Sequence, residues 1–141
     1  MNASATTPSP PDPAAPAPRC VVLLVDDHAD TLAMLCRLLR SQGHAVLDCA
    51  DCAAARAAAE AALARGERVD VIIGDISLPD GDGVDLMCAL KTRLGCVAIA
   101  LTGHGMEEDV QRCAEAGIDR HLLKPVGVRE LDASIRNLAG C

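Results

Sequence analysis

No phenylalanine, tyrosine or tryptophan occurs in this sequence of 141 residues, although half of its residues are hydrophobic. A chain of this length can form one domain with a sizeable core. Without aromatic side chains, that core has to be built from alanine, leucine, valine, isoleucine and cysteine.

Positive charge is also scarce. Thirteen lysine and arginine residues stand against twenty aspartate and glutamate residues, and the net charge is −7. A nucleic-acid surface needs a basic stripe that meets the phosphates, so this composition argues against direct nucleic-acid binding. Only Lys91 and Lys124 are lysines, so a lysine in a special position is easy to recognise.

The sequence lacks a charged leader followed by an apolar segment, and it has no apolar run near 18 residues. We therefore expect a cytoplasmic protein without a membrane partner, whose cysteines stay reduced and act as small core hydrophobes. Cys49 and Cys52 form one CxxC motif, which we interpret as a chance pair. The alternative is a redox pair at a helix start, where the helix dipole favours thiolate. No second CxxC or Cys/His cluster completes a zinc site.

Prolines are concentrated at one end of the sequence. Six of the eight lie within residues 1–18, mixed with alanine, serine and threonine. Such a segment buries nothing, so we predict a disordered tail or linker over 1–18 and one folded domain over 19–141.

From residue 19 onward, short apolar runs typical of strands alternate with segments of helical period. The strands are expected at 21–25, 44–49, 69–75, 96–101 and 119–123, each followed by a helix. Asp51 can cap the second helix. Right-handed crossovers place the five strands in one parallel sheet with helices on both faces. The pattern thus predicts an α/β fold of the doubly wound (βα)5, flavodoxin-like type.

Folds of this type bind ligands outside the carboxyl ends of their strands. The residues expected at those ends are polar or charged: Asp26 and Asp27 in "VVLLVDDHAD", then Asp75, Thr102, and Lys124 with Pro125. Three carboxylates in one pocket repel each other unless a cation binds, and an oxygen-only site suits Mg²⁺. Lysine supplies a point charge for an anion, and threonine an adjustable donor. The set predicts a phosphoryl-transfer site with a carboxylate available as nucleophile.

Four motifs at these positions are "VDD", "GDISLPDGDG", "ALTGHG" and "LLKP". With them the sequence resembles the receiver domains of two-component response regulators, the CheY-like family, over about residues 20–139. The resemblance implies that Asp75 accepts a phosphoryl group from a histidine kinase or a phosphotransfer protein. It also implies that Mg²⁺ is held by Asp27, Asp75 and the backbone carbonyl of Ser77, with Asp26 acting mostly through a metal-bound water.

The same resemblance makes Lys124 the partner of the phosphoryl group, Thr102 the switch hydroxyl, and the bond before Pro125 cis. A downstream protein would bind the face formed by the helix that stops at Gly117, the strand 119–123 and the last helix. The family's aromatic switch position is His121 here. This histidine either swings in and out, adding pH sensitivity near neutrality, or is a solvated surface residue.

The other histidines, His28, His44 and His104, are predicted to be surface or loop residues. The segments "EAGIDRHLLKPV" and "ALTGHGMEED" look more like receivers attached to hybrid sensor histidine kinases. Because the sequence ends just after the last helix, we expect output through protein contact, either as a separate regulator or as a module of a hybrid kinase.

The expected function is phosphorelay signalling, with no catalysis beyond the domain's own phosphorylation and dephosphorylation. A different class would be an aspartate-nucleophile phosphohydrolase, but it needs a second aspartate two residues after the nucleophile, where Ser77 stands. A flavodoxin-like cofactor binder would need a phosphate loop after the first strand, and "VDDHAD" repels phosphate unless a metal is bound.

Overall fold

A computed structural model describes residues 19–103 and 107–140. Five parallel strands form the central sheet, in the order β2–β1–β3–β6–β7. They are β1 (Val21–Val25), β2 (Ala45–Cys49), β3 (Val71–Asp75), β6 (Val97–Thr102) and β7 (Arg120–Leu123). A small antiparallel hairpin of β4 (Ser77–Leu78) and β5 (Gly81–Asp82) lies between β3 and the next helix.

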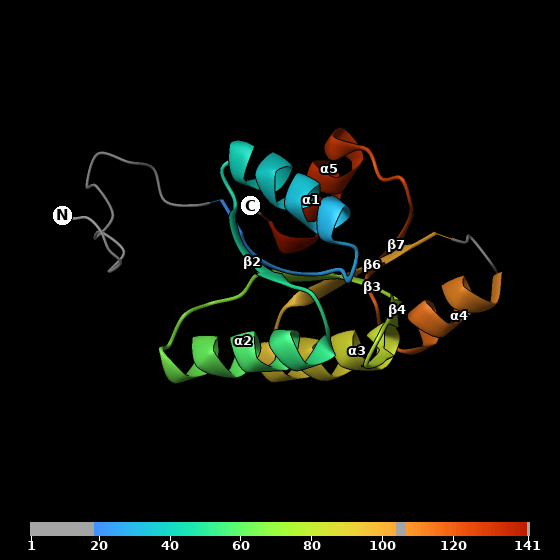
Figure 1. Ribbon diagram of the computed structural model, residues 1–141, viewed down its shortest axis with the longest axis horizontal. Coiled ribbons are helices and arrows are strands. Elements are labelled where there is room, and N and C mark those ends of the chain that lie inside the picture. Colours follow the sequence, from blue (N-terminus) through green and yellow to red (C-terminus); the bar gives the residue numbers. More distant parts are fainter. Residues whose placement is uncertain (1–18, 104–106, 141) are drawn as a thin grey trace.

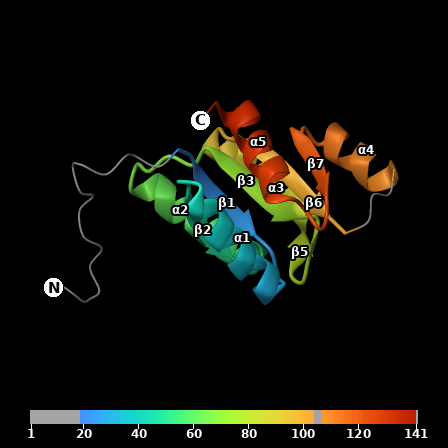
Figure 2. The same cartoon turned by 90° about the horizontal axis from the view of Figure 1, so that it is seen from above.

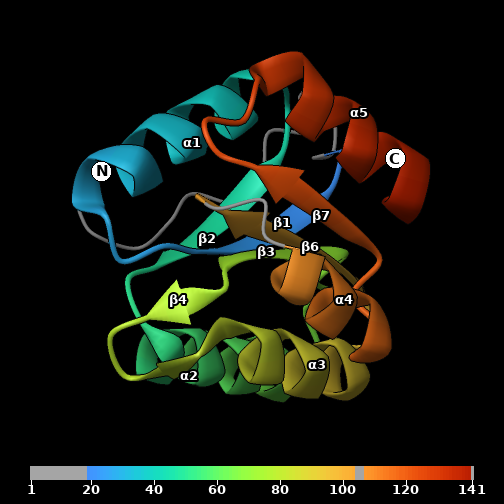
Figure 3. The same cartoon turned by 90° about the vertical axis from the view of Figure 1, so that its right-hand side faces the viewer.

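Helices cover both faces of this sheet. Figures 1 and 3 show α1 (Ala29–Ser41) and α5 (Val128–Ala139) on one side, with α2 (Cys52–Ala64) and α3 (Gly83–Leu94) on the other. The short helix α4 (Glu107–Glu115) lies at the β7 end of the sheet, as the view from above also shows (Figure 2). The predicted doubly wound fold is confirmed. No helix in the described part of the chain is long and apolar enough to cross a membrane.

Local signals explain where the helices begin and end. Asp51 caps α2 as predicted, because its carboxylate accepts from the Ala54 N–H at 2.8 Å. Asp82 caps α3 in the same way, and Gly95 ends that helix in the left-handed conformation. The predicted bounds of the first strand match β1, and those of the other four strands differ by one or two residues from the observed ones. The β4–β5 hairpin was not predicted, since two-residue strands carry no hydrophobic period.

The core consists of two layers, one on each face of the sheet. Leu23 packs toward α2 and α3, whereas its neighbour Leu24 packs toward α1 and α5. Because both faces are covered, the inner strands of the sheet have no polar side, which is why β1 reads as an unbroken apolar run. Six described cysteines are free thiols. Cys20 is disulfide-bonded, so the expectation that all cysteines stay reduced is wrong at this position.

His44 lies in the loop just before β2, but it is not a surface residue. Its side chain is fully buried, and Nε2 lies 2.9 Å from Oδ1 of Asp132 in α5. A partner 88 residues away in sequence leaves no local signal, which is why the burial of this histidine was not predicted. His28 is exposed, as predicted. His104 and the predicted tail 1–18 lie outside the described residues.

Candidate functional site

The polar site begins where the central strands end. Asp26 directly follows β1, and Asp75 is the last residue of β3, which pairs with β1 in parallel. Carboxyl ends of neighbouring parallel strands meet at one edge, so the register brings the two carboxylates together. With Asp27 they form a cluster in which one carboxylate oxygen of each residue lies within 4.8 Å of the others.

The three carboxylates differ in their surroundings. Asp26 is fully buried, Asp75 is half-buried and Asp27 is exposed. The backbone N–H of His28 donates to Oδ1 of Asp26 at 2.8 Å, and that of Ser77 donates to Oδ1 of Asp75 at 3.0 Å. The local turns therefore orient two of the carboxylates, while the third faces solvent.

Lys124 is the cation of this cluster. Its Nζ donates to Oδ2 of Asp26 and to Oδ2 of Asp75, both at 2.9 Å. Burial alone would lower the pKa of Lys124, but the hydrogen bonds to the two aspartates outweigh it and raise the pKa. The ammonium is therefore charged at neutral pH. The backbone N–H of Lys124 donates to the carbonyl of Thr102 at 2.7 Å, and the peptide bond from Lys124 to Pro125 is cis.

A cavity of about 580 Å³ opens beside Asp75. Thr102, buried at the end of β6, lines it together with Lys124. His121 is not among the described lining residues. It lies half-buried on β7, and its buried Nε2 has no hydrogen-bond partner among the residues that the structure describes.

Three further charged residues line this cavity and were not predicted as part of the site: Asp82, Asp109 and Arg112. Asp82 caps α3, and its other carboxylate oxygen accepts from Nη2 of Arg112 in α4. Asp82 stands in the glycine-rich "DGDG" segment, where a helix cap is a fair expectation. Arg112 carries no such signal, because only the fold brings α4 next to this segment.

Gly83, the first residue of α3, was also missed. A Cβ at this position would overlap the carbonyl oxygen of Asp75 and the Cα of Ile76. The absence of a side chain thus lets α3 begin directly against the backbone of the central aspartate.

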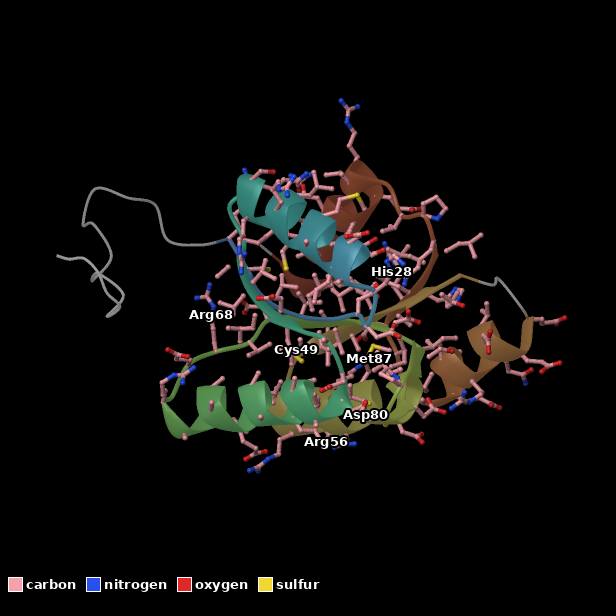
Figure 4. The ribbon with its side chains drawn as sticks, in the orientation of Figure 1. His28, Cys49, Arg56, Arg68, Asp80 and Met87 are labelled. Carbon is pink, nitrogen blue, oxygen red and sulfur yellow. The ribbon has the colours of Figure 1, made fainter. Side chains whose placement is uncertain are left out.

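The hairpin after Asp75 is tied to α2 as well. The carboxylate of Asp80 accepts from the N–H groups of Cys52 and Ala53 at 2.8 and 3.0 Å, and these bonds lower the pKa of Asp80. Figure 4 shows Asp80 beside the start of α2 and Cys49 between the sheet and this helix. Burial raises the pKa of both CxxC thiols, that of Cys49 to about 11, which is the opposite of a reactive pair.

The donor set fits a divalent cation that prefers oxygen. Three carboxylates gather within 4.8 Å of one another, and Lys124 offsets only part of their negative charge. Carboxylate oxygens, backbone carbonyls and water are the ligands that Mg²⁺ accepts. The arrangement can therefore hold a metal beside a carboxylate that faces an open cavity.

Comparison with known proteins agrees with this geometry. The sequence is 36% identical over 121 residues to the transcriptional regulatory protein AruR of Pseudomonas aeruginosa, covering 83% of this chain and 48% of that protein. It is 33% identical to the virulence sensor protein BvgS of Bordetella pertussis, covering 78% of this chain and 9% of that protein. The chain thus spans half or less of the length of these relatives.

A solved structure shows the same fold. The CheY-like receiver domain protein of Methanospirillum hungatei superposes with a TM-score of 0.74 at 28% identity, covering 84% of this chain and 91% of that one. The family model of the response regulator receiver domain matches residues 22–136, from β1 into α5. The chain therefore belongs to the response regulator receiver domain family of two-component signalling.

Proposed function

We propose that this domain accepts a phosphoryl group on Asp75 from a histidine kinase or a phosphotransfer protein, with Mg²⁺ as cofactor. One observation carries the proposal: the carboxylate of Asp75 faces an open cavity while Lys124 holds it beside two further carboxylates. A carboxylate so placed can act as nucleophile, and the ammonium can offset the charge of the incoming group.

Asp27, Asp75 and the backbone carbonyl of Ser77 would hold the metal, and Asp26 would act at longer range. The exposure of Asp27 and the full burial of Asp26 support this assignment. When bound, Mg²⁺ supplies positive charge that lets the carboxylates stay ionised together and attracts phosphate oxygens.

The transfer itself exchanges one bond for another. A carboxylate oxygen of Asp75 forms a bond to phosphorus as the phosphorus–nitrogen bond of a phosphohistidine breaks. The imidazole nitrogen keeps the electron pair of that bond and takes up a proton. Lys124 stays protonated throughout because its pKa is raised, so it pairs with the new phosphoryl oxygens. Hydrolysis of the resulting acyl phosphate would reset the domain.

Output through the face of α4, β7 and α5 is part of the same proposal. Val110 of α4 and Leu123 of β7 are large apolar residues of this face that are 42% and 51% exposed, which suits a protein partner. Thr102 would move toward the phosphoryl group and His121 would follow. A receiver of this kind serves equally in a separate regulator or in a hybrid kinase.

Intact-mass spectrometry after treatment with a small phosphodonor tests the proposal. We expect the gain of one phosphoryl group in the presence of Mg²⁺, and none after chelation. Asp75→Asn should abolish the gain, whereas the control Asp85→Asn, on the exposed side of α3, should retain it. Labelling that persists in Asp75→Asn would refute the assignment.

Asp27→Ala should weaken Mg²⁺ binding more than Asp26→Ala, and an unchanged affinity of Asp27→Ala would reject the ligand set.

A further inference from the structure

Helix α4 is the most weakly packed helix of the domain. Of its nine residues, all within the described part of the chain, Cys113 alone is buried. The helix packs chiefly on the edge strand β7, and Figure 1 shows it apart from the other helices. An element with so little buried surface opens or shifts more readily than the rest of a fold.

One ion pair joins this helix to the site. Arg112 of α4 donates from Nη2 to Oδ2 of Asp82, while Oδ1 of the same carboxylate accepts from the Val84 N–H at 2.8 Å. Burial opposes ionisation of Asp82, but the hydrogen bonds from Arg112 and from the α3 backbone outweigh it and lower its pKa. The guanidinium and the carboxylate are therefore both charged at neutral pH, and the cap of α3 is tied to α4.

The ion pair lies in the wall of the cavity beside Asp75. Lys124 and Arg112 are the cationic side chains among the described lining residues of that cavity. A phosphoryl group carries about two negative charges and three acceptor oxygens, and on Asp75 it replaces the single charge of the carboxylate, so the cavity gains about one negative charge. Placed on Asp75, it would attract Arg112 in competition with Asp82.

We propose that the Asp82–Arg112 ion pair is a latch that holds α4 in its present position, and that a phosphoryl group on Asp75 opens it by drawing Arg112 away from Asp82. The opening signal rests on the proposed function, because it requires charge at Asp75. The latch itself does not, because both of its residues are in contact in the unmodified chain. Coupling between the ion pair and the phosphoryl group is reciprocal. If the ion pair disfavours the phosphorylated arrangement by a given factor, removing the ion pair must favour that arrangement by the same factor.

Asp82→Asn separates the two roles of this residue. Asparagine caps a helix as well as aspartate does, so α3 keeps its start, while Arg112 loses its charged partner. The probe is beryllofluoride, a phosphoryl mimic, titrated in excess Mg²⁺ and followed by the NMR signals of α4. Both side chains are partly exposed, 47% for Arg112 and 35% for Asp82. We therefore expect Asp82→Asn to bind the mimic about two- to fivefold more tightly than the parent chain.

A double-mutant cycle and a matched pair complete the experiment. In an Arg112→Ala background, Asp82→Asn should have no further effect on the affinity. Glu60→Gln, which breaks a more exposed ion pair with Arg93 away from the cavity, should leave the affinity unchanged. An unchanged affinity of Asp82→Asn, or a gain that persists without Arg112, would overturn the latch.

Labelling of the Cys113 thiol tests the latch without any phosphoryl mimic. Asp82→Asn and Arg112→Ala should both speed the reaction of this buried thiol about two- to fivefold, because α4 opens more often. If the parent chain does not bind beryllofluoride but labelling is faster in both variants, the proposed function is refuted and the latch is supported. Labelling rates equal to that of the parent chain reject the latch.

Discussion

Helices α3 and α4 each follow a strand of the sheet whose last residue belongs to the site, yet they are anchored in different ways. Helix α3 buries five residues and starts on a capped turn: the buried residues are Gly83, Val84, Leu86, Met87 and Leu90. Helix α4 buries one, Cys113. Figure 3 shows the contrast, with α3 lying along the sheet beside α2 and α4 standing at its edge.

This difference divides the site into a fixed and an adjustable half. Asp75 lies on the fixed half, where the start of α3 presses against its backbone. Thr102 leads toward the adjustable half, where α4 is held by little apolar surface. A metal site requires carboxylates held in place, whereas a switch requires an element with two accessible arrangements. The uneven packing therefore suits both the metal site and the switch that the proposed function requires.

Adding a methyl group at Gly83 should break the fixed half. The Cβ of Gly83→Ala would overlap the backbone of Asp75, which cannot turn aside as a flexible side chain can. We expect a loss of at least about 3 kcal/mol in the free energy of unfolding, the upper end of overpacking costs. Urea denaturation followed by circular dichroism measures it. Gly127→Ala is the control, because a Cβ there meets nothing within 4 Å, and equal costs for the two variants would contradict the close approach.

Cavity-creating substitutions in the two helices sharpen the comparison. Leu86→Ala in α3 should cost about 3 kcal/mol of unfolding free energy, because this side chain is fully buried in the core. Cys113→Ala in α4 should cost only about 1 kcal/mol, since it removes a single sulfur atom from a sparsely packed helix. Denaturant midpoints measure both costs, provided that the dependence of the unfolding free energy on denaturant concentration stays unchanged. A larger cost for Cys113→Ala than for Leu86→Ala would reverse our assignment of the two halves.

The side of the molecule on which α2 and α3 pack should also have a pH signature. Burial raises the pKa of Cys49 and of Cys96 from 9.0 to about 11. As pH rises through this window, the unfolded chain releases thiol protons that the folded chain keeps, so the free energy of unfolding falls. We expect a loss of about 2 kcal/mol for each thiol by the top of the window.

Denaturation at several alkaline pH values measures this slope. A chain with Cys49→Ala and Cys96→Ala should show a flatter pH dependence than the parent chain, whatever its absolute stability. Identical slopes for the two chains would show that the thiols titrate as they do in water.

The smallest expected effect concerns His121, on the adjustable half. Its buried Nε2 lacks a partner among the described residues. If His121 takes part in the switch, the NMR shifts that beryllofluoride causes in α4, β7 and α5 should be smaller in His121→Ala than in the parent chain. Shifts that are unaltered in His121→Ala would leave the switch to Thr102 alone.

The sequence by itself determined the fold class and placed the polar residues at the carboxyl ends of the strands. Alternating strand and helix periods predicted the doubly wound sheet, because strands covered on both faces must be apolar throughout. Parallel strands present their carboxyl ends at one edge, so Asp26, Asp75 and Lys124 could be placed together before any distance was known. The ion pairs from Lys124 to Asp26 and Asp75 agree with that placement.

Only the tertiary structure decided which distant side chains meet. His44 contacts Asp132, which lies 88 residues away in sequence, and Arg112 contacts Asp82, which lies 30 residues away. Neither pair follows a period or a motif, because a periodic pattern records which face of an element is buried and not which element covers it. The weak anchoring of α4 has the same origin. Glu107, Glu108 and Asp109 in its first turn favour a helix at this place in the sequence. How much of that helix is buried, however, depends on its place at the edge of the sheet.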